Sequence, residues 1–218
     1  MTYEEVCKDR AVQVYIAQAD RSMEALGFTE HSFAHVVRVA NMAGEILTAL
    51  GYGARTVELA KIAGYLHDIG NLVNRIDHSQ SGAVMAFRIL DRMDFPPEEI
   101  AEIVTAIGNH DEGTGVPVNG VSAALILADK SDVRRSRVRD KADIAEDIHD
   151  RVNYSVTDAV LSVDAQEKRI MLDLSVDTAV SSVMEYFEIF MKRMLLCRRA
   201  AAALGCSFQL RINGQLLA

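Results

Sequence analysis

Tryptophan is absent from this sequence, and proline and cysteine are scarce, with three of each among 218 residues. The cysteines Cys7, Cys197 and Cys206 are scattered and odd in number, so they predict neither a disulfide framework nor the paired spacing of a zinc ribbon. We expect reduced thiols in a cytoplasmic protein. The low proline content argues against the disordered and repeat-rich classes.

Long hydrophobic runs are missing as well. No apolar stretch approaches the ~18–20 residues needed to span a bilayer, and residues 1–10 are too polar for a signal peptide. Basic residues are outnumbered, 23 against 31 acidic ones, which leaves a net charge of −8. This balance argues against a nucleic-acid coat and a membrane-surface protein. We therefore expect no membrane and no nucleic acid among the partners.

The first two-thirds of the chain has the hydrophobic periodicity of amphipathic helices. Gly27 and Gly51 follow two such segments and mark helix ends, and Pro96-Pro97 followed by two glutamates marks a helix start. The expected helices span residues 6–26, 33–50, 55–68, 79–93, 97–110 and 121–132. This pattern predicts a helical domain over residues 1–150.

The last third differs in character. Residues 154–163 and 168–175 alternate between apolar and polar side chains, which predicts a β-hairpin. Asp177 is expected to cap a long helix with an apolar stripe over residues 180–195, and residues 207–212 predict a further strand. The expected fold is mainly α, a helical bundle with a small α+β appendage over residues 151–218.

Histidines and aspartates recur at the predicted helix ends. Imidazole and carboxylate groups bind divalent ions such as Fe, Mn, Co, Ni, Zn or Mg. Adjacent helical residues point about 100° apart, so the His67-Asp68 pair can approach an ion from two directions. The candidate metal ligands are His35, His67, Asp68, His78, His110 and Asp129.

The order of these residues resembles the HD-domain superfamily of metal-dependent phosphohydrolases over residues 31–132. The resemblance implies that His35, the His67-Asp68 doublet and Asp129 hold one metal ion. It also implies that His78 and His110 are the additional ligands of members with two ions, which Asp68 would bridge.

The HD-GYP cyclic-dinucleotide phosphodiesterases have a different pattern. They carry two successive histidines where this chain has His110-Asp111, and a Gly-Tyr-Pro element that residues 113–117 lack. Hydrolysis of cyclic di-GMP is therefore not expected.

Several histidines have alternative roles. His78 and His110 can also cap a helix or contact a phosphate, and His31 can support His35 or face solvent. The second His-Asp pair, His149-Asp150, is expected to have a structural or substrate-pocket role, because no glycine turn follows it.

The resemblance implies hydrolysis of a phosphate ester by metal-activated water. Such an ion lowers the pKa of its water to about 7. Candidates for protonating the leaving group are Asp111, Glu112 and Lys130. A nucleotide or another small phosphorylated metabolite is the expected substrate.

Positive charge should surround that phosphate. A basic run follows Asp129, although it also fits a solvated helix face. From this run and from the candidate site we select Arg75, Arg134, Arg135 and Arg38 as substrate contacts. Arg137, Arg139 and Lys141 complete the run.

Two other functions remain open. The same ligands also resemble the HD-fold di-iron oxygenases, and the domain can act as a non-catalytic nucleotide-binding regulator. The long C-terminal helix also offers an interface for a homodimer.

Overall fold

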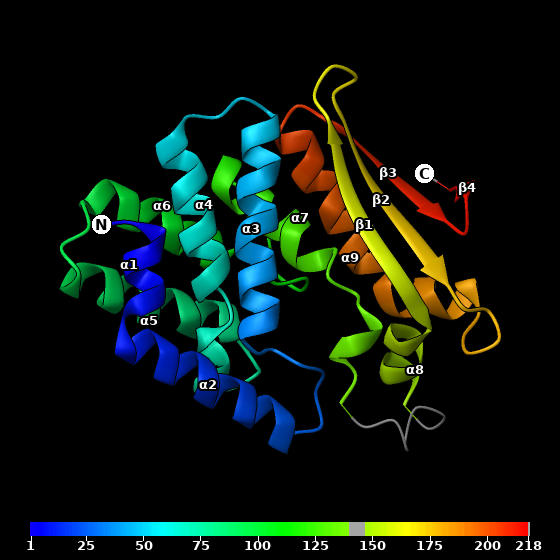
Figure 1. Ribbon diagram of the computed structural model, residues 1–218, viewed down its shortest axis with the longest axis horizontal. Helices are drawn as coiled ribbons and strands as arrows, with labels where there is room; N and C mark the ends of the chain where they lie inside the picture. Colours follow the sequence, from blue (N-terminus) through cyan, green and yellow to red (C-terminus); the bar gives the residue numbers. More distant parts are fainter. Residues whose placement is uncertain (140–146, 218) are drawn as a thin grey trace.

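The computed structural model describes residues 1–139 and 147–217. Helices occupy the N-terminal part of the chain, and a small sheet with two further helices forms the C-terminal part (Figure 1). This arrangement confirms the expected fold, mainly α with a small α+β appendage. The N-terminal elements are α1 (Tyr3–Lys8), α2 (Arg10–Ala25), α3 (Phe33–Ala49), α4 (Ala54–Leu66), η1 (Ile69–Leu72), α5 (His78–Arg92), α6 (Pro97–Gly108), α7 (Gly120–Lys130) and η2 (Arg135–Arg137).

The central helix is α7, where every residue from Val121 to Lys130 is buried. It packs against α3, α4 and α6. The outer helices α2, α5 and α6 instead bury one apolar stripe each. Because α7 ends deep in the bundle, the polar residues of its last turn lie in a buried position.

Two expected helix starts differ from the structure. The first predicted helix is divided at Asp9, whose extended backbone ends α1 and whose side chain accepts a hydrogen bond from Val12 N–H to start α2. Asp177 does not cap the long helix α9 (Val183–Ala203). Ser182 and Glu185 exchange side-chain-to-backbone hydrogen bonds there, a capping box that satisfies two otherwise unpaired N–H groups.

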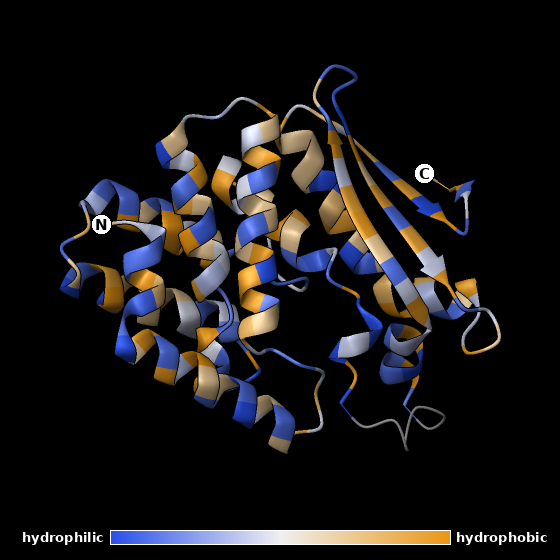
Figure 2. Ribbon diagram, viewed as in Figure 1, coloured by the Kyte–Doolittle hydropathy of each residue, from blue (hydrophilic) through white to orange (hydrophobic). Residues whose placement is uncertain are grey.

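The C-terminal elements are α8 (Ile148–Ser155), β1 (Val156–Asp164), β2 (Arg169–Val176), α9, β3 (Ser207–Ile212) and β4 (Gln215–Leu216). The strands form one sheet in the order β1-β2-β3-β4. The β1–β2 and β3–β4 pairs are antiparallel, whereas β2 and β3 are parallel and are joined by α9. Buried and more exposed positions largely alternate along β1 and β2, as a half-buried sheet requires, and both strands mix hydrophobic with hydrophilic residues (Figure 2).

Helix α9 joins the two parts of the molecule. It contacts α7 on one side and β3 on the other (Figure 1). One hydrophobic core includes Leu125 of α7, Tyr186 and Leu196 of α9, and Leu172 of β2. The division into domains 1–150 and 151–218 stays a prediction. No helix in the described part of the chain is long and apolar enough to cross a bilayer.

The α3–α4 contact brings two predicted metal ligands together. At Gly64 of α4, an added Cβ would lie 2.7 Å from Ala40 Cα of α3, so no side chain fits there. This close approach places the rings of His35 and His67 with their centroids 5.2 Å apart.

Replacing Gly64 with alanine should force α3 and α4 apart. Overpacking of this kind costs about 1–3 kcal/mol, which urea denaturation measures as a lower free energy of unfolding. Gly108→Ala is the matched control, because its added methyl group would lie 3.7 Å from Ala83 Cβ and would favour the helix. Equal stability of the Gly64→Ala variant and the wild type would contradict the close approach.

Candidate metal centre

Six buried side chains meet where five helices begin or end. His35 lies in the first turn of α3, His78 is the first residue of α5, and His110 follows α6. His67 and Asp68 follow α4, and Asp129 lies in the last turn of α7. Each of the six side chains belongs to a residue no more than 8% exposed. The structure therefore brings together all of the predicted metal ligands.

The first half of the cluster contains four of these groups. His35 Nε2 lies 3.5 Å from Asp68 Oδ2 and 3.4 Å from Asp129 Oδ1. His67 Nε2 lies 3.2 Å and 3.6 Å from the same two oxygens. Ligands bound at about 2.0–2.2 Å to one ion lie about 3–3.6 Å apart by geometry. The four groups thus have the spacing of one coordination shell.

The second half lies on the other side of Asp68. Asp68 Oδ1 is 3.6 Å from His78 Nε2, which is 3.2 Å from His110 Nε2. The two carboxylate oxygens of Asp68 therefore face two different groups of histidines. This is the geometry of a carboxylate that can bridge two ions.

The outer nitrogens of the four histidines all have hydrogen-bond acceptors. The Nδ1–H of His67 donates to the Gly64 carbonyl (2.8 Å), that of His110 to Ile107 (2.6 Å) and that of His78 to Arg75 (3.1 Å). The fourth, His35, donates Nδ1–H to the carboxylate of Asp132 at 2.8 Å. These bonds leave each Nε2 lone pair directed at the cluster, as in metal-binding histidines.

The Nε2 atoms that face the cluster show whether a metal ion would fit. The Nε2 atoms of His35 and His67 are buried and have no hydrogen-bond partner among the described residues. Leaving a buried polar atom unpaired is costly, whereas a divalent ion would use both lone pairs. The donor set, imidazole nitrogens and carboxylate oxygens, therefore fits a divalent metal.

The ionisation of the clustered side chains also favours a bound divalent metal. Burial raises the pKa of Asp68, but the charge of His67 outweighs it and holds this pKa well below its usual value. Burial also opposes ionisation of Asp129, which Lys130 and the histidines keep ionised. Burial lowers the pKa of His67, but nearby Asp68 and Asp129 raise it to about 10. The cluster thus holds excess negative charge that protons or a metal cation must balance.

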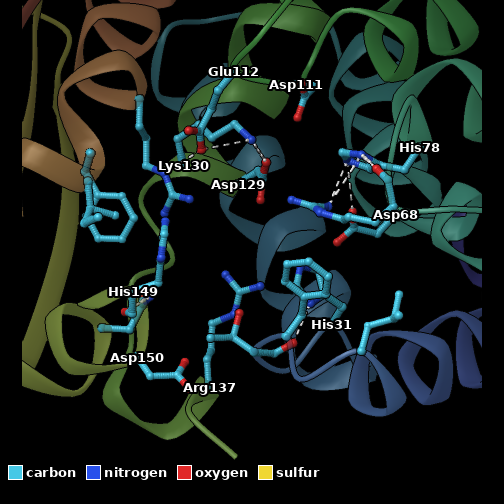
Figure 3. Close-up of a pocket in the computed structure, with 18 of the residues that line it drawn as sticks. His31, Asp68, His78, Asp111, Glu112, Asp129, Lys130, Arg137, His149 and Asp150 are labelled. Atoms are coloured by element: carbon cyan, nitrogen blue, oxygen red, sulfur yellow. Dashed lines mark hydrogen bonds and ion pairs between the residues drawn. The ribbon is translucent and has the colours of Figure 1, made fainter. Parts of the chain in front are cut away.

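A cavity of about 410 Å³ opens beside this cluster. Figure 3 shows His149 and Asp150 across the cavity from Asp68 and His78. The second His-Asp pair therefore lines the pocket, as expected, and does not join the metal ligands. His31 also lines it, and its Nδ1–H donates to the Thr29 carbonyl at 2.6 Å.

A chain of alternating charges runs from the metal ligands along the cavity. Lys130 Nζ lies 2.7 Å from Asp129 Oδ2 and 3.7 Å from Glu112 Oε1. Arg193 of α9 donates from Nε to the same Glu112 oxygen at 2.7 Å and stacks on Phe190. Lys130, Glu112, Asp111 and Arg75 all line the cavity.

Three of the four predicted substrate arginines lie elsewhere. Arg38, Arg134 and Arg135 line a separate cavity behind the metal centre, so they cannot contact a substrate in the pocket. The physical reason is that the chain turns away after Asp129 and Lys130, and Asp132 holds Arg134 there. Lys141 lies outside the described residues.

Arg193 and Asp132 were not expected from the sequence, and Arg137 was expected only as a member of the basic run, not as a selected substrate contact. Arg193 reaches the pocket through the packing of α9 on α7, which no local pattern encodes. Arg137 lines the pocket and donates to the carbonyls of Glu30 and Asp132. The sequence feature that could have identified Asp132 is its position three residues after Asp129 on the same buried segment.

One protein-family profile matches the part of the chain that contains the candidate metal ligands. The profile of the protein family described as HD domain matches residues 32–152. Uncharacterized protein MJ1020 from Methanocaldococcus jannaschii is 27% identical over 162 residues, 64% of this chain and 62% of that protein. Ribonuclease Y 1 from Pediococcus pentosaceus is 34% identical over 100 residues, 44% of this chain and 17% of that protein. The chain thus spans less than two-thirds of either relative.

A solved structure gives a weaker likeness. It is described as a predicted HD superfamily hydrolase from an uncultured Thermotogales bacterium. The two chains are 26% identical, with a TM-score of 0.46 and coverage of 62% of this chain and 75% of that one.

Asp68→Asn should remove most of the bound metal while preserving the shape of the side chain. The variant loses the charge that faces both groups of histidines, and elemental analysis after dialysis against Mn or Co measures the loss. Asp91→Asn, an exposed aspartate paired with Arg88, is the matched control. Equal metal content in the wild type and both variants would contradict the ligand assignment.

Asp132→Asn should weaken metal binding without removing a ligand. The amide can still accept the His35 Nδ1–H, but the lost charge makes His35 a poorer ligand, and such changes typically cost about 10–100-fold in metal affinity. Competition titration with a chelator measures the dissociation constant. An unchanged constant would show that Asp132 does not tune His35.

Proposed function

This chain belongs to the HD domain family, and from its candidate metal centre we propose that it is a metal-dependent phosphohydrolase. The observation that carries the proposal is the convergence of four imidazole nitrogens and two carboxylates beside a cavity whose mixed-charge wall includes Arg75, Lys130 and Arg193. The imidazoles and carboxylates suit a divalent metal, and the cationic side chains of the cavity wall suit a substrate that carries phosphate.

The metal-binding residues would be His35, His67, Asp68 and Asp129, with His78 and His110 completing a second position. A divalent ion held there would acidify a water molecule and neutralise charge on phosphoryl oxygens. The Nδ1–H bonds described above fix the rings before any ion arrives, which supports an organised site.

Lys130, Arg75 and Arg193 are the proposed phosphate contacts. Arg75 is held by Asn71 Oδ1 at 3.3 Å and lies over the ring of Phe28, so its guanidinium is fixed at the cavity wall. Arg193 is fixed by Glu112 and Phe190. Arginine binds phosphate through a planar fork of donors, and two such groups with Lys130 can orient one phosphoryl group.

Glu112 and Lys130 suit positioning better than proton donation. Burial would raise the pKa of Glu112, but the charges of Arg193 and Lys130 lower it below its usual value. Burial would lower the pKa of Lys130, but Asp129 and Glu112 raise it. Both groups therefore stay charged near neutral pH. Asp111 remains the proposed contact for the leaving group, since it lines the same cavity.

The size of the cavity bears on the substrate. About 410 Å³ is within the range of pockets for small molecules. Phe28, Ile189 and Phe190 add apolar wall to the cationic groups, which suits a small phosphorylated molecule with an apolar portion, such as a nucleotide. One relative bears the name ribonuclease, so phosphodiesters also belong in the test.

The test is a panel of phosphomonoesters and phosphodiesters, assayed with Mn, Co, Ni or Mg under argon. Arg193→Gln should keep its metal, raise KM and lower kcat/KM by about 10²–10³-fold, because one preorganised charge on the phosphate is lost. Arg198→Gln is the matched control, since Arg198 is exposed on the same helix.

The outcomes separate the competing functions. Phosphate release under argon that requires metal supports the proposal. Consumption of dioxygen with bound iron, without phosphate release, would instead indicate an oxygenase. Tight nucleotide binding without turnover on the panel would indicate a regulatory domain.

A further inference from the structure

A second cavity, of about 590 Å³, lies between the helical bundle and the first strand. Its polar wall comes from α3, from the segment around η2, and from the α8–β1 junction. We call it the arginine cavity, lined by Arg38, Arg134, Arg135, Ser136, Tyr154 and Thr157 among others. None of its lining residues lines the pocket beside the metal centre.

Two of its guanidinium groups have hydrogen-bonding capacity to spare. Within the described residues, Arg38 makes two long contacts, from Nε to Asp132 Oδ1 and from Nη2 to the Ala159 carbonyl, both 3.4 Å. Its side chain is 43% exposed. Arg135 Nη2 is buried and has no hydrogen-bond partner among the described residues, and its ion pair with Asp177 is 3.5 Å long.

The third guanidinium is already satisfied. Arg134 forms a two-pronged pair with Asp132, with nitrogen–oxygen distances of 2.5 Å and 3.0 Å. Arg38 and Arg135 are therefore the groups available to an anion. The ring of Tyr154 packs under Arg135, with the guanidinium carbon 4.4 Å from its centroid, and holds it in place.

The remaining wall defines the rest of the ligand. Asp158 also lines the cavity and accepts the Ala159 N–H at 3.0 Å, so it can accept a further donor from a ligand. The hydroxyl of Thr157 donates to the Ser175 carbonyl, which leaves its oxygen as an acceptor. A ligand that carries hydroxyl donors beside its anionic group would therefore match this wall.

We propose that the arginine cavity is a second binding site, which takes a small hydroxyl-bearing phosphate ester with its phosphate on Arg38 and Arg135. Phosphate oxygens pair with the exposed parts of both guanidinium groups. The hydroxyl groups of the ligand donate to Asp158 and Thr157. This ligand is an effector, because the cavity contains none of the metal ligands.

The carboxylate of Asp132 connects the two sites. Asp132 accepts the His35 Nδ1–H on one side and contacts Arg134 and Arg38 on the other. An anion that neutralises Arg38 leaves Asp132 a stronger acceptor, which makes His35 more basic and a better metal ligand. The negative charge of the bound anion also attracts the metal ion. Both effects favour metal binding, so the effector should lower the dissociation constant of the metal. Linkage requires that the metal tighten effector binding by the same factor.

Selenate and sulfate are suitable probes, because they are tetrahedral dianions that the enzyme cannot hydrolyse. Crystals of the metal-loaded full chain, soaked in selenate, should show selenium by anomalous scattering between Arg38 and Arg135. Selenium found only in the metal pocket, or an adventitious ion only at exposed side chains, would overturn the site.

In solution, sulfate should raise Tm relative to chloride at equal ionic strength, since a ligand of the native state stabilises it. Arg38→Gln and Arg135→Gln should each weaken sulfate binding by about tenfold, the loss of one charge-assisted contact. Arg88→Gln, an exposed arginine on α5, is the matched control and should respond as the wild type does. The readout is the increment caused by sulfate, so a general loss of stability does not mimic it. Equal increments in all four proteins would overturn the proposal.

The coupling has its own measurement. Sulfate should lower the dissociation constant of the metal in the wild type and in Arg75→Gln, which alters the metal pocket. It should have no effect in Arg38→Gln. Loss of the effect in Arg75→Gln alone would place the anion in the metal pocket and overturn the coupling through Asp132.

Discussion

The structure depends on the burial of two carboxylates and four imidazoles at one point in an apolar bundle. Burial of unpaired charge and of unpaired lone pairs is costly, and the Nε2 atoms of His35 and His67 have no hydrogen-bond partner among the described residues. A divalent cation removes both costs at once. The close approach of α3 and α4 at Gly64 and the outward hydrogen bonds of the histidines keep the groups converged on that point.

The helices and the metal ligands could be predicted from the sequence because their signals are local. Apolar periodicity located the bundle helices, and histidines at their ends, in the order of a known family, pointed to the side chains that the structure brings together. Where two local signals competed, the prediction was less accurate. Asp9 divides one expected helix because its side chain caps a new one, and Ser182 with Glu185 starts α9 in place of Asp177.

The walls of the pocket could not be predicted, because they depend on which elements pack together. Arg193 is separated from Glu112 by 81 positions and meets it only because α9 packs on α7. The run from Arg134 to Arg139 was expected to face the substrate. Asp132 instead directs Arg134 to the far side of His35. Asp132 thus lies between the two cavities and contacts residues of both sites, His35 on one side and Arg134 on the other.

X-ray absorption spectroscopy of the metal-loaded protein can show whether these histidines and aspartates bind the ion. We expect a first shell of nitrogen and oxygen atoms at about 2.0–2.2 Å, with the outer-shell scattering of several imidazole rings, and fewer imidazoles in a His67→Ala variant. A first shell made of water oxygens alone, with no imidazole signal, would contradict it.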